Sequence, residues 1–392
     1  MDPVRNPYAP GAGQRPPELA GRDAELATFD VLLERIARGR PERSVVLTGL
    51  RGVGKTVLLN ALRSAAVRRG WGTGKLEARP DQDLRRPLAG ALHLAVRELA
   101  GSQPDEAQHV LGVIKSFAQH AVGAKGRQWQ PGIDVAAVAG RADSGDIETD
   151  LVELLTDVAG LAGDSGHGIA IFLDEMQDLG PDDVAALCAA CHEISQQGRP
   201  LVVVGAGLPH LPTVLSAAKS YSERLFRYAR IDRLDRAAHD LALQVPARDE
   251  GAEFSDDALA AMYAATGGYP YFVQAYGKVA WDIAPRSPIT AADIAVAAPE
   301  AEVELAVGFF GSRYERATPA EREYLRAMAE VGGADDVVLT AEVAKAVGRP
   351  PQSLSPARDG LLKKGLVYSG QRGRIAFTVP HFGRYLSRLP DA

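Results

Sequence analysis

The sequence has little of what marks secreted, membrane-bound or nucleic-acid-coating proteins. Its 392 residues include only two cysteines, too few for a disulfide framework, so we expect a reducing cytoplasm. No apolar run approaches the roughly 18 residues of a membrane span, which argues against a membrane partner. The Pro- and Gly-rich start, MDPVRNPYAPGAGQRPPEL, has no apolar core, so it predicts an ordered arm or a loose lead-in and not a signal peptide. The net charge is −6, so any contact with nucleic acid is expected to be local.

The stretch SVVLTGLRGVGKTVLL stands out from an otherwise ordinary globular composition. Val45–Leu47 predict a buried strand, Val57–Arg63 predict a helix, and the residues between them match the pattern G-x-x-x-x-G-K-T. Glycines let several N–H groups converge on one anion, and the helix dipole adds positive potential there. Lys55 is expected to reach the β- and γ-phosphates of ATP, and the Thr56 hydroxyl to bind Mg²⁺. The predicted nucleotide-binding residues of this phosphate loop are Gly49, Arg51, Gly52, Val53, Gly54, Lys55, Thr56 and Val57.

A second strand is expected to bring carboxylates to the same edge of a sheet. In GIAIFLDEMQDLG, the apolar strand Ile169–Leu173 ends in Asp174 and Glu175, and open α/β sheets place their ligands at the carboxyl ends of their strands. Asp174 is predicted to hold Mg²⁺ through water, and Glu175 to act as general base for the attacking water. For Gln177 and Asp178 two interpretations stay open: a functional role, in positioning water or as a sensor contact, and a solvated loop.

Three further strands complete the predicted parallel sheet, at Gly72–Arg79, Arg199–Pro209 and Arg227–Leu234. Because Glu follows Asp in the acidic strand, we expect one other strand to lie between it and the phosphate-loop strand. Residues Phe117–Asp150 are too many for a simple connection. We interpret them as an insertion with a small hairpin around Trp129–Val138.

These motifs resemble the AAA+ division of P-loop ATPases, and more narrowly the branch of origin-recognition initiators, archaeal-type ATPases and STAND signalling ATPases. LAGRDAEL, residues 19–26, is similar to the box that precedes the phosphate loop in that branch and lies near the adenine. SERLFRYARIDRLD, residues 222–235, resembles the box whose arginine, here Arg224, reaches a neighbour's nucleotide, which implies a homo-oligomer. The alternative for Arg224 is a surface ion pair. GGYPYFVQ, residues 267–274, resembles the Gly-x-Pro element of STAND lids, which implies that Pro270 lies against the nucleotide.

Two positions depart from the pattern of this family. The first-sensor position usually has Asn, Ser or Thr, but the segment Gly205–Leu208 offers no side-chain donor. The lid near Pro270 shows no clear second-sensor arginine. Both departures favour a slow nucleotide switch over fast hydrolysis.

The remaining chain predicts a helical lid and a small C-terminal domain. Helical patterns run from Arg236 to about Arg316, with a Ser cap at Ser255, a stop at Gly267 and Pro270 at the next helix start. Beyond them the pattern predicts two helices capped by threonine, a third helix over Ser353–Lys364 and a hairpin with the turn GQRG. This is the plan of a winged helix. The two capping residues are Thr318 and Thr340.

Double-stranded DNA is one predicted partner of this winged helix, because its third helix could enter a major groove and its wing could contact phosphates. A protein partner is the alternative, because Pro356 interrupts the predicted helix and the basic patch is modest. The predicted DNA contacts are Gln352, Ser353, Ser355, Arg358, Lys363, Lys364, Arg372 and Arg374.

One motif carries no function in this interpretation. Cys188, Cys191 and His192 have the spacing of a c-type haem attachment site. The two cysteines lie on an apolar helical stripe with Val184, Leu187 and Ile194, so we expect them to be buried core residues. Three side chains are also too few for a structural zinc site.

The sequence therefore predicts an α/β fold: the parallel sheet sandwich of an AAA+-like P-loop NTPase, a helical lid and a C-terminal winged helix. The expected domains are 1–235 (an arm and the ATPase), 236–316 (the lid) and 317–392 (the winged helix). The leading hypothesis is an ATPase with ATP and Mg²⁺ as cofactors, which turns over slowly and acts by assembly or switching. Two alternatives stay open, a non-enzymatic regulator that holds ATP or ADP and signals to a protein partner, and a loader ATPase of a replication or mobile-element machine.

Overall fold

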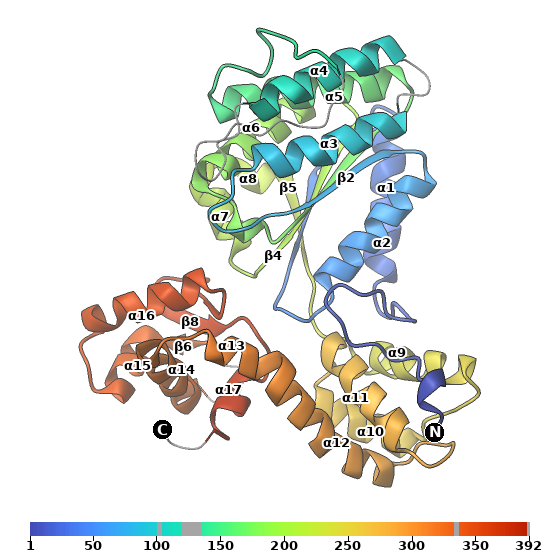
Figure 1. The fold of residues 1–392 in the computed structure, drawn as a ribbon, viewed down its shortest axis with the longest axis vertical. Helices are drawn as coiled ribbons and strands as arrows, with labels where there is room; N and C mark the ends of the chain where they lie inside the picture. The colour runs from blue at the N-terminus through green and yellow to red at the C-terminus, as the bar shows by residue number, and fades with distance from the viewer. Residues whose placement is uncertain (100–103, 120–134, 333–336, 390–392) are drawn as a thin grey trace. The chain divides into compact units, whose positions relative to one another are not determined.

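The structure is a computed structural model that describes residues 1–99, 104–119, 135–332 and 337–389. The chain folds as two compact units, each made of segments that are separate in the sequence (Figure 1). The sheet unit comprises Asp23–Thr48 and Leu58–Arg230. The lid unit comprises Met1–Arg22, Gly49–Val57 and Ile231–Ala392.

A five-stranded parallel sheet forms the centre of the sheet unit. Its strands are β1 (Ser44–Thr48), β2 (Gly72–Glu77), β3 (Ile169–Asp174), β4 (Leu201–Gly207) and β5 (Phe226–Arg230). They lie in the order β2-β3-β4-β1-β5. The strand β4 therefore separates the phosphate-loop strand β1 from the acidic strand β3, which confirms the expected arrangement. Since all strands are parallel, their carboxyl ends share one edge of the sheet.

Helices cover both faces of this sheet, because the strands carry apolar side chains on both sides. Ile169, Ile171 and Leu173 of β3 belong to the core formed with α3, α5 and α6. Phe172 points to the opposite face and packs edge-on against Phe29 of α1, with ring centroids 6.2 Å apart. The helices of this part are α1 (Asp23–Ala37), α2 (Lys55–Arg68), α3 (Arg85–Leu99), α4 (Pro104–Gln119), α5 (Ile147–Asp164), α6 (Pro181–Gln196), α7 (Leu211–Ala218) and α8 (Ser222–Leu225).

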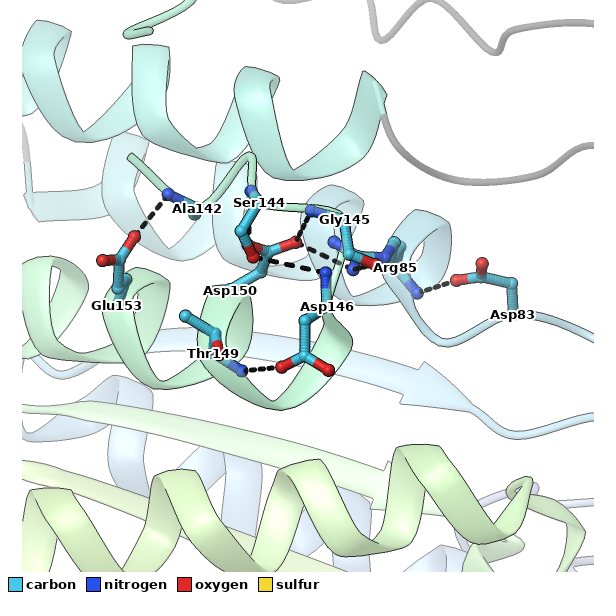
Figure 2. Close-up of polar contacts among 9 residues, drawn as sticks. All are labelled: Asp83, Arg85, Ala142, Ser144, Gly145, Asp146, Thr149, Asp150 and Glu153. Carbon is cyan, nitrogen blue, oxygen red and sulfur yellow. Dashed lines mark hydrogen bonds and ion pairs between the residues drawn. The ribbon is translucent and has the colours of Figure 1, made fainter. Parts of the chain in front are cut away.

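A buried ion pair ties α5 to the start of α3, the helix that follows β2 (Figure 2). Nη2 of Arg85 lies 2.9 Å from Oδ2 of Asp150, and the two side chains are 4% and 0% exposed. Asp150 also accepts the N–H groups of Ser144 at 2.8 Å and Gly145 at 3.2 Å. The Arg85 guanidinium covers the ring of Phe117 at 4.8 Å. The buried carboxylate thus has both a counter-charge and hydrogen-bond donors, as such groups require.

The predicted hairpin around Trp129–Val138 is not tested, because residues 120–134 lie outside those that the structure describes. The chain that follows, up to α5, packs against α4. Lys115 donates through Nζ to the carbonyl of Val135 at 2.7 Å, and the N–H of Val138 donates to the carbonyl of Gly112 at 3.3 Å.

The lid unit begins with an ordered N-terminal arm. The indole Nε1 of Trp281 donates to the carbonyl of Asp2 at 2.9 Å, and the Asn6 amide donates to the carbonyl of Lys278 at 3.0 Å. The predicted helix stop at Gly267 is confirmed, with φ of +59°. The helices are α9 (Arg236–Asp249), α10 (Asp256–Thr266), α11 (Pro270–Ile283), α12 (Ala291–Leu305), the π-helix η3 (Ala306–Gly311) and α13 (Ser312–Glu315).

The C-terminal part of this unit, the C-terminal module, combines helices with a small antiparallel sheet in the order β6-β8-β7. Its hairpin was predicted, but the two-residue strand β6 was not, because it is too short to show a periodicity. The elements are α14 (Pro319–Gly332), β6 (Val338–Leu339), α15 (Thr340–Val347), α16 (Pro351–Lys363), β7 (Val367–Tyr368), β8 (Arg374–Phe377) and α17 (Phe382–Leu386).

Two local predictions for this module were wrong. Thr340 is the first residue of α15 and not its cap, because its N–H donates to the carbonyl of Gly373 at 2.9 Å and extends the β6–β8 pairing. Pro356 lies inside α16 without interrupting it. The proline removes only the hydrogen bond to the carbonyl of Gln352, and Gln352 is exposed, so water can bind that carbonyl.

The cap at Thr318 is confirmed, because Thr318 and Glu321 form a reciprocal capping box. The N–H of Thr318 donates to Glu321 Oε2 at 2.7 Å, and the N–H of Glu321 donates to Thr318 Oγ1 at 3.4 Å.

Among the described residues, no helix is long and apolar enough to cross a membrane.

Candidate nucleotide-binding site

The phosphate loop connects β1 to α2 and has the backbone that its glycines predict. Gly52 and Gly54 have φ of +85° and +91°, which favour glycine. Lys55 opens α2 and is only 7% exposed. Its Nζ donates to the carbonyls of Gly49 at 2.9 Å and Leu50 at 2.8 Å. The ammonium group is therefore held over the loop, where an anion bound by the loop would meet it.

Three distant segments of the lid unit bind the main chain of this loop. The N–H of Tyr271, beside Pro270 at the start of α11, donates to the carbonyl of Gly52 at 3.2 Å. The N–H of Arg51 donates to the carbonyl of Thr378, just after β8, at 2.8 Å. From the N-terminal box, Arg22 donates through Nη2 to the carbonyl of Val53 at 3.2 Å. The loop is thus a junction of the arm, the lid and the C-terminal module.

Sequence reasoning missed Arg22, Tyr271 and Thr378 as neighbours of the loop. Arg22 is 8% exposed and also donates to the carbonyl of Asp232 at 2.6 Å. The box LAGRDAEL, to which Arg22 belongs, was a signal that could have revealed it. Tyr271 and Thr378 act through their main chains, which have no side-chain signature in a sequence.

The acidic strand end places two carboxylates in different settings. Asp174 is the last residue of β3 and is 4% exposed, and its carbonyl accepts the N–H of Ala78 from the chain after β2 at 3.0 Å. Glu175 has a left-handed backbone with φ of +51°. Its N–H donates to Asp174 Oδ1 at 3.0 Å. The backbone thus turns sharply between the strand residue Asp174 and Glu175, which were predicted to have different roles.

Oxygen ligands suit Mg²⁺, which usually keeps several waters and takes only one or two protein groups. The buried carboxylate of Asp174 and the hydroxyl of Thr56 are of this kind, so the residues present fit the ion. No cluster of three or more His, Cys, Asp or Glu side chains that could hold a metal occurs among the described residues, and Mg²⁺ of a phosphate loop does not need one.

Arg224 lies in the short helix α8, and its side chain is exposed. Within the described part of the chain it makes no ion pair, so the surface ion pair is not observed there. Its predicted role at a neighbour's nucleotide stays a prediction.

The two cysteines of the haem-like motif are buried, as expected. Burial raises the pKa of Cys188 to about 11 and that of Cys191 to about 12, so both remain neutral thiols.

The predicted DNA contacts fall into two groups. Gln352, Ser353 and Lys363 are exposed on α16, and Arg372 and Arg374 are exposed in and beside the β7–β8 turn. Two other cations are paired: Arg358 lies 3.1 Å from Asp359 Oδ1, and Lys364 Nζ lies 2.5 Å from Glu321 Oε2. The half-buried Ser355 donates to the carbonyl of Pro351 at 3.4 Å. The positive charge of this face therefore rests mainly on Lys363 and the two turn arginines.

Comparisons with known proteins agree with this geometry. Residues 18–204 match the family described as an AAA ATPase domain, and residues 307–386 match a domain of unknown function (DUF8462). The comparison with curated proteins found no match. The Walker-type ATPase PABY2304 of Pyrococcus abyssi is a structural neighbour with a TM-score of 0.59 at 14% identity, and the match covers 95% of this chain and 97% of that one.

Two other solved structures have lower scores. Aeropyrum pernix Orc1 in complex with DNA matches with a TM-score of 0.45 at 15% identity, over 95% of this chain and 93% of that one. The Thermotoga maritima RuvB Holliday junction branch migration motor matches with 0.45 at 17% identity, over 93% and 96%. The family match and the phosphate loop at the carboxyl edge of a parallel sheet lead to one conclusion: residues 18–204 of this chain belong to the AAA+ P-loop ATPases.

Proposed function

We propose that this protein is a nucleotide-dependent switch that binds ATP with Mg²⁺, hydrolyses it slowly and transmits the state of the phosphate loop to its C-terminal module. The hydrogen bond from the Arg51 N–H to the Thr378 carbonyl, at 2.8 Å, carries this proposal. A loop that binds phosphate through its main chain cannot change its path without changing this bond. The C-terminal module is therefore coupled to the loop directly.

In this proposal the chemistry belongs to four side chains of one copy and to an arginine of a neighbouring copy. Lys55 compensates the charge of the β- and γ-phosphates, and Thr56 and Asp174 hold Mg²⁺, which supplies further charge stabilisation. Glu175 accepts a proton from the attacking water. Arg224 of one copy completes the site of a neighbouring copy in a homo-oligomer, and its exposure on α8 supports that role.

The domain boundaries that we propose are 235/236 and 316/317. They separate the ATPase part from the lid helices α9–α13 and from the C-terminal module, which we assign as a winged helix. Its three helices α14–α16 and the sheet β6-β8-β7 support this assignment.

Hydrogen exchange with and without ATP tests the switch. We expect ATP to change the protection of the Arg51 amide and of the peptides around Thr378, and we expect Lys55→Ala to abolish this response. ATP turnover is measured on the same samples. Tight binding with no change around Thr378 would contradict the switch. A change around Thr378 without any turnover would favour the non-enzymatic regulator, which holds ATP or ADP and signals to a protein partner.

Double-stranded DNA is the second candidate ligand, favoured by the exposed cations Lys363, Arg372 and Arg374. None of the three makes an ion pair within the described residues. Replacing all three by alanine should weaken duplex binding for every sequence alike. It should also flatten the salt dependence of binding by about 0.9 units of slope for each phosphate that the protein no longer neutralises.

The matched control for this DNA test removes three exposed arginines from the sheet unit, Arg40, Arg43 and Arg68, and so produces the same net charge. The control should keep the salt slope of the parent protein. If the parent protein does not bind a duplex at low salt with ATP present, DNA is excluded as the ligand, and the C-terminal module is expected to bind a protein partner.

A further inference from the structure

A glutamine side chain connects the carboxyl ends of β3 and β4. Gln177 lies in the one-turn helix Met176–Asp178 that follows Glu175. Its amide nitrogen Nε2 donates to Oε2 of Glu175 at 2.5 Å. Its carbonyl oxygen Oε1 accepts the N–H of Leu208, just beyond β4, at 3.0 Å. The side chain thus joins the predicted general base to the segment where the family has its first sensor.

Hydrogen-bond chemistry fixes the orientation of this amide. A main-chain N–H can only donate, so the group that faces Leu208 must be the amide oxygen. An ionised carboxylate can only accept, so the group that faces Glu175 must be the NH₂. A flipped amide would lose both bonds. The NH₂ group has a second hydrogen, which can be offered to another acceptor at this edge of the sheet.

Two glycines of the first-sensor segment leave space for the side chains of the one-turn helix that follows β3. A Cβ on Gly207 would lie 2.7 Å from Oε1 of Gln177, and a Cβ on Gly205 would lie 1.9 Å from Sδ of Met176. Both distances are shorter than any real contact of that kind. The missing Asn, Ser or Thr is therefore matched by a side chain from the turn after the neighbouring strand β3, which brings a donor of its own.

We propose that Gln177 is the positioning residue for Glu175 and takes the place of the missing first-sensor side chain. This inference rests on the proposed hydrolysis of ATP. The amide oxygen is anchored on the main chain of β4, so the NH₂ group is held still and sets the direction of the Glu175 carboxylate. Because β3, β4 and β1 are parallel neighbours, this contact lies at the sheet edge where β1 leads into the phosphate loop.

The test is steady-state ATP hydrolysis together with equilibrium ATP binding. Gln177→Ala should lower kcat about 10- to 100-fold, as expected when a catalytic group loses its orientation. ATP affinity and KM should stay at the parental values, because Glu175 does not hold the nucleotide. Gln177→Glu should lower kcat further, because a carboxylate would then face Glu175 where a donor is needed.

A matched control and a rescue separate positioning from support of the fold. Gln197, at the end of α6, also donates to a glutamate, Glu193, at 2.6 Å, but on the surface, so Gln197→Ala should leave kcat unchanged. In Gln177→Ala, adding Gly207→Ser should recover part of kcat, because the serine hydroxyl enters the space that the amide leaves. A methyl of Leu211, 2.7 Å from that Cβ position, has to rotate aside.

A double-mutant cycle shows whether Gln177 acts through Glu175. In a Glu175→Gln background, Gln177→Ala should cause no further loss of the single-turnover rate. A further loss there, or parental kcat in Gln177→Ala, would overturn the inference and leave the ATPase standing. A fall of affinity, stability and kcat together would also overturn it, as a sign of a structural role. A parent protein that binds ATP without turnover would overturn the proposed hydrolysis and this inference with it.

Discussion

The strands β1 and β4 are parallel neighbours that end at the same edge of one sheet, yet only the segment after β1 could be identified as a site from its own residues. The phosphate loop is a contiguous sequence motif, because its glycines, Lys55 and Thr56 follow one another in the chain. The end of β4 offers no side-chain donor, and the amide that lies beside it belongs to Gln177, in the turn after the neighbouring strand β3. A contiguous motif can be recognised in a sequence, whereas a contact between residues that follow different strands appears only in the structure.

Replacing Lys55 tests the contiguous motif and should have the largest effect. Lys55→Ala removes the ammonium group that is held over the loop, so ATP binding should be abolished or nearly so. Equilibrium binding of ATP measures it. Lys75→Ala is the matched control, because Lys75 is a partly buried lysine of β2 that donates to Asn60 Oδ1 at 2.5 Å. Normal nucleotide affinity in Lys55→Ala would refute the phosphate-loop interpretation.

The two carboxylates after β3 should separate binding from chemistry. Glu175→Gln should keep ATP affinity and lose turnover on the order of 10²–10⁴-fold, as is typical of a general base. Asp174→Asn should instead weaken the Mg²⁺-dependent part of ATP binding. Turnover and a Mg²⁺ titration of ATP affinity check the pair. Parental turnover in Glu175→Gln would mean that the base lies elsewhere.

A second contact between residues far apart in the chain, the ion pair of Arg85 and Asp150, should matter for stability. Asp150→Ala leaves a buried guanidinium without its counter-charge, which typically costs about 3–5 kcal/mol. Arg141→Ala is the control, because its pair with Asp157 at 2.7 Å is 37% exposed on the arginine side and should contribute about 1 kcal/mol or less. Urea unfolding and hydrogen exchange in α5 measure both. Equal losses in the two variants would show that burial does not strengthen this pair.

The same contrast explains what the sequence could and could not predict. The five sheet strands and the glycine stop at Gly267 follow from periodicity and backbone preferences within short windows, and the structure has them. The neighbours of the phosphate loop could not be predicted from such windows, because Tyr271 and Thr378 bind the loop through their main chains from more than 200 residues away. A functional role of Gln177 was only one of two interpretations, because no residue near it in the chain indicates that Leu208 is its hydrogen-bond partner.

The smallest expected effect concerns Asp183, in the first turn of α6, and the nearby Asp83, which precedes α3. Burial first, and then the nearby charges of Asp83 and Asp182, raise the pKa of Asp183, at the start of α6, to about 6, against the opposing effects of the Leu84 N–H and Arg85. The folded protein therefore binds more protons than the unfolded chain between pH 3.8, the ordinary pKa, and about pH 6. The contribution of Asp183 to stability falls as the pH rises through this window, because the half-buried carboxylate must then ionise. Asp183→Asn removes that proton linkage, so it should stabilise the protein relative to the parent above pH 6 and have little effect near pH 4. Urea midpoints at both pH values measure the difference, with Asp182→Asn, on the exposed neighbour, as the control. A constant difference between parent and variant across this range would mean that Asp183 ionises normally and that neither burial nor the charge of Asp83 raises its pKa.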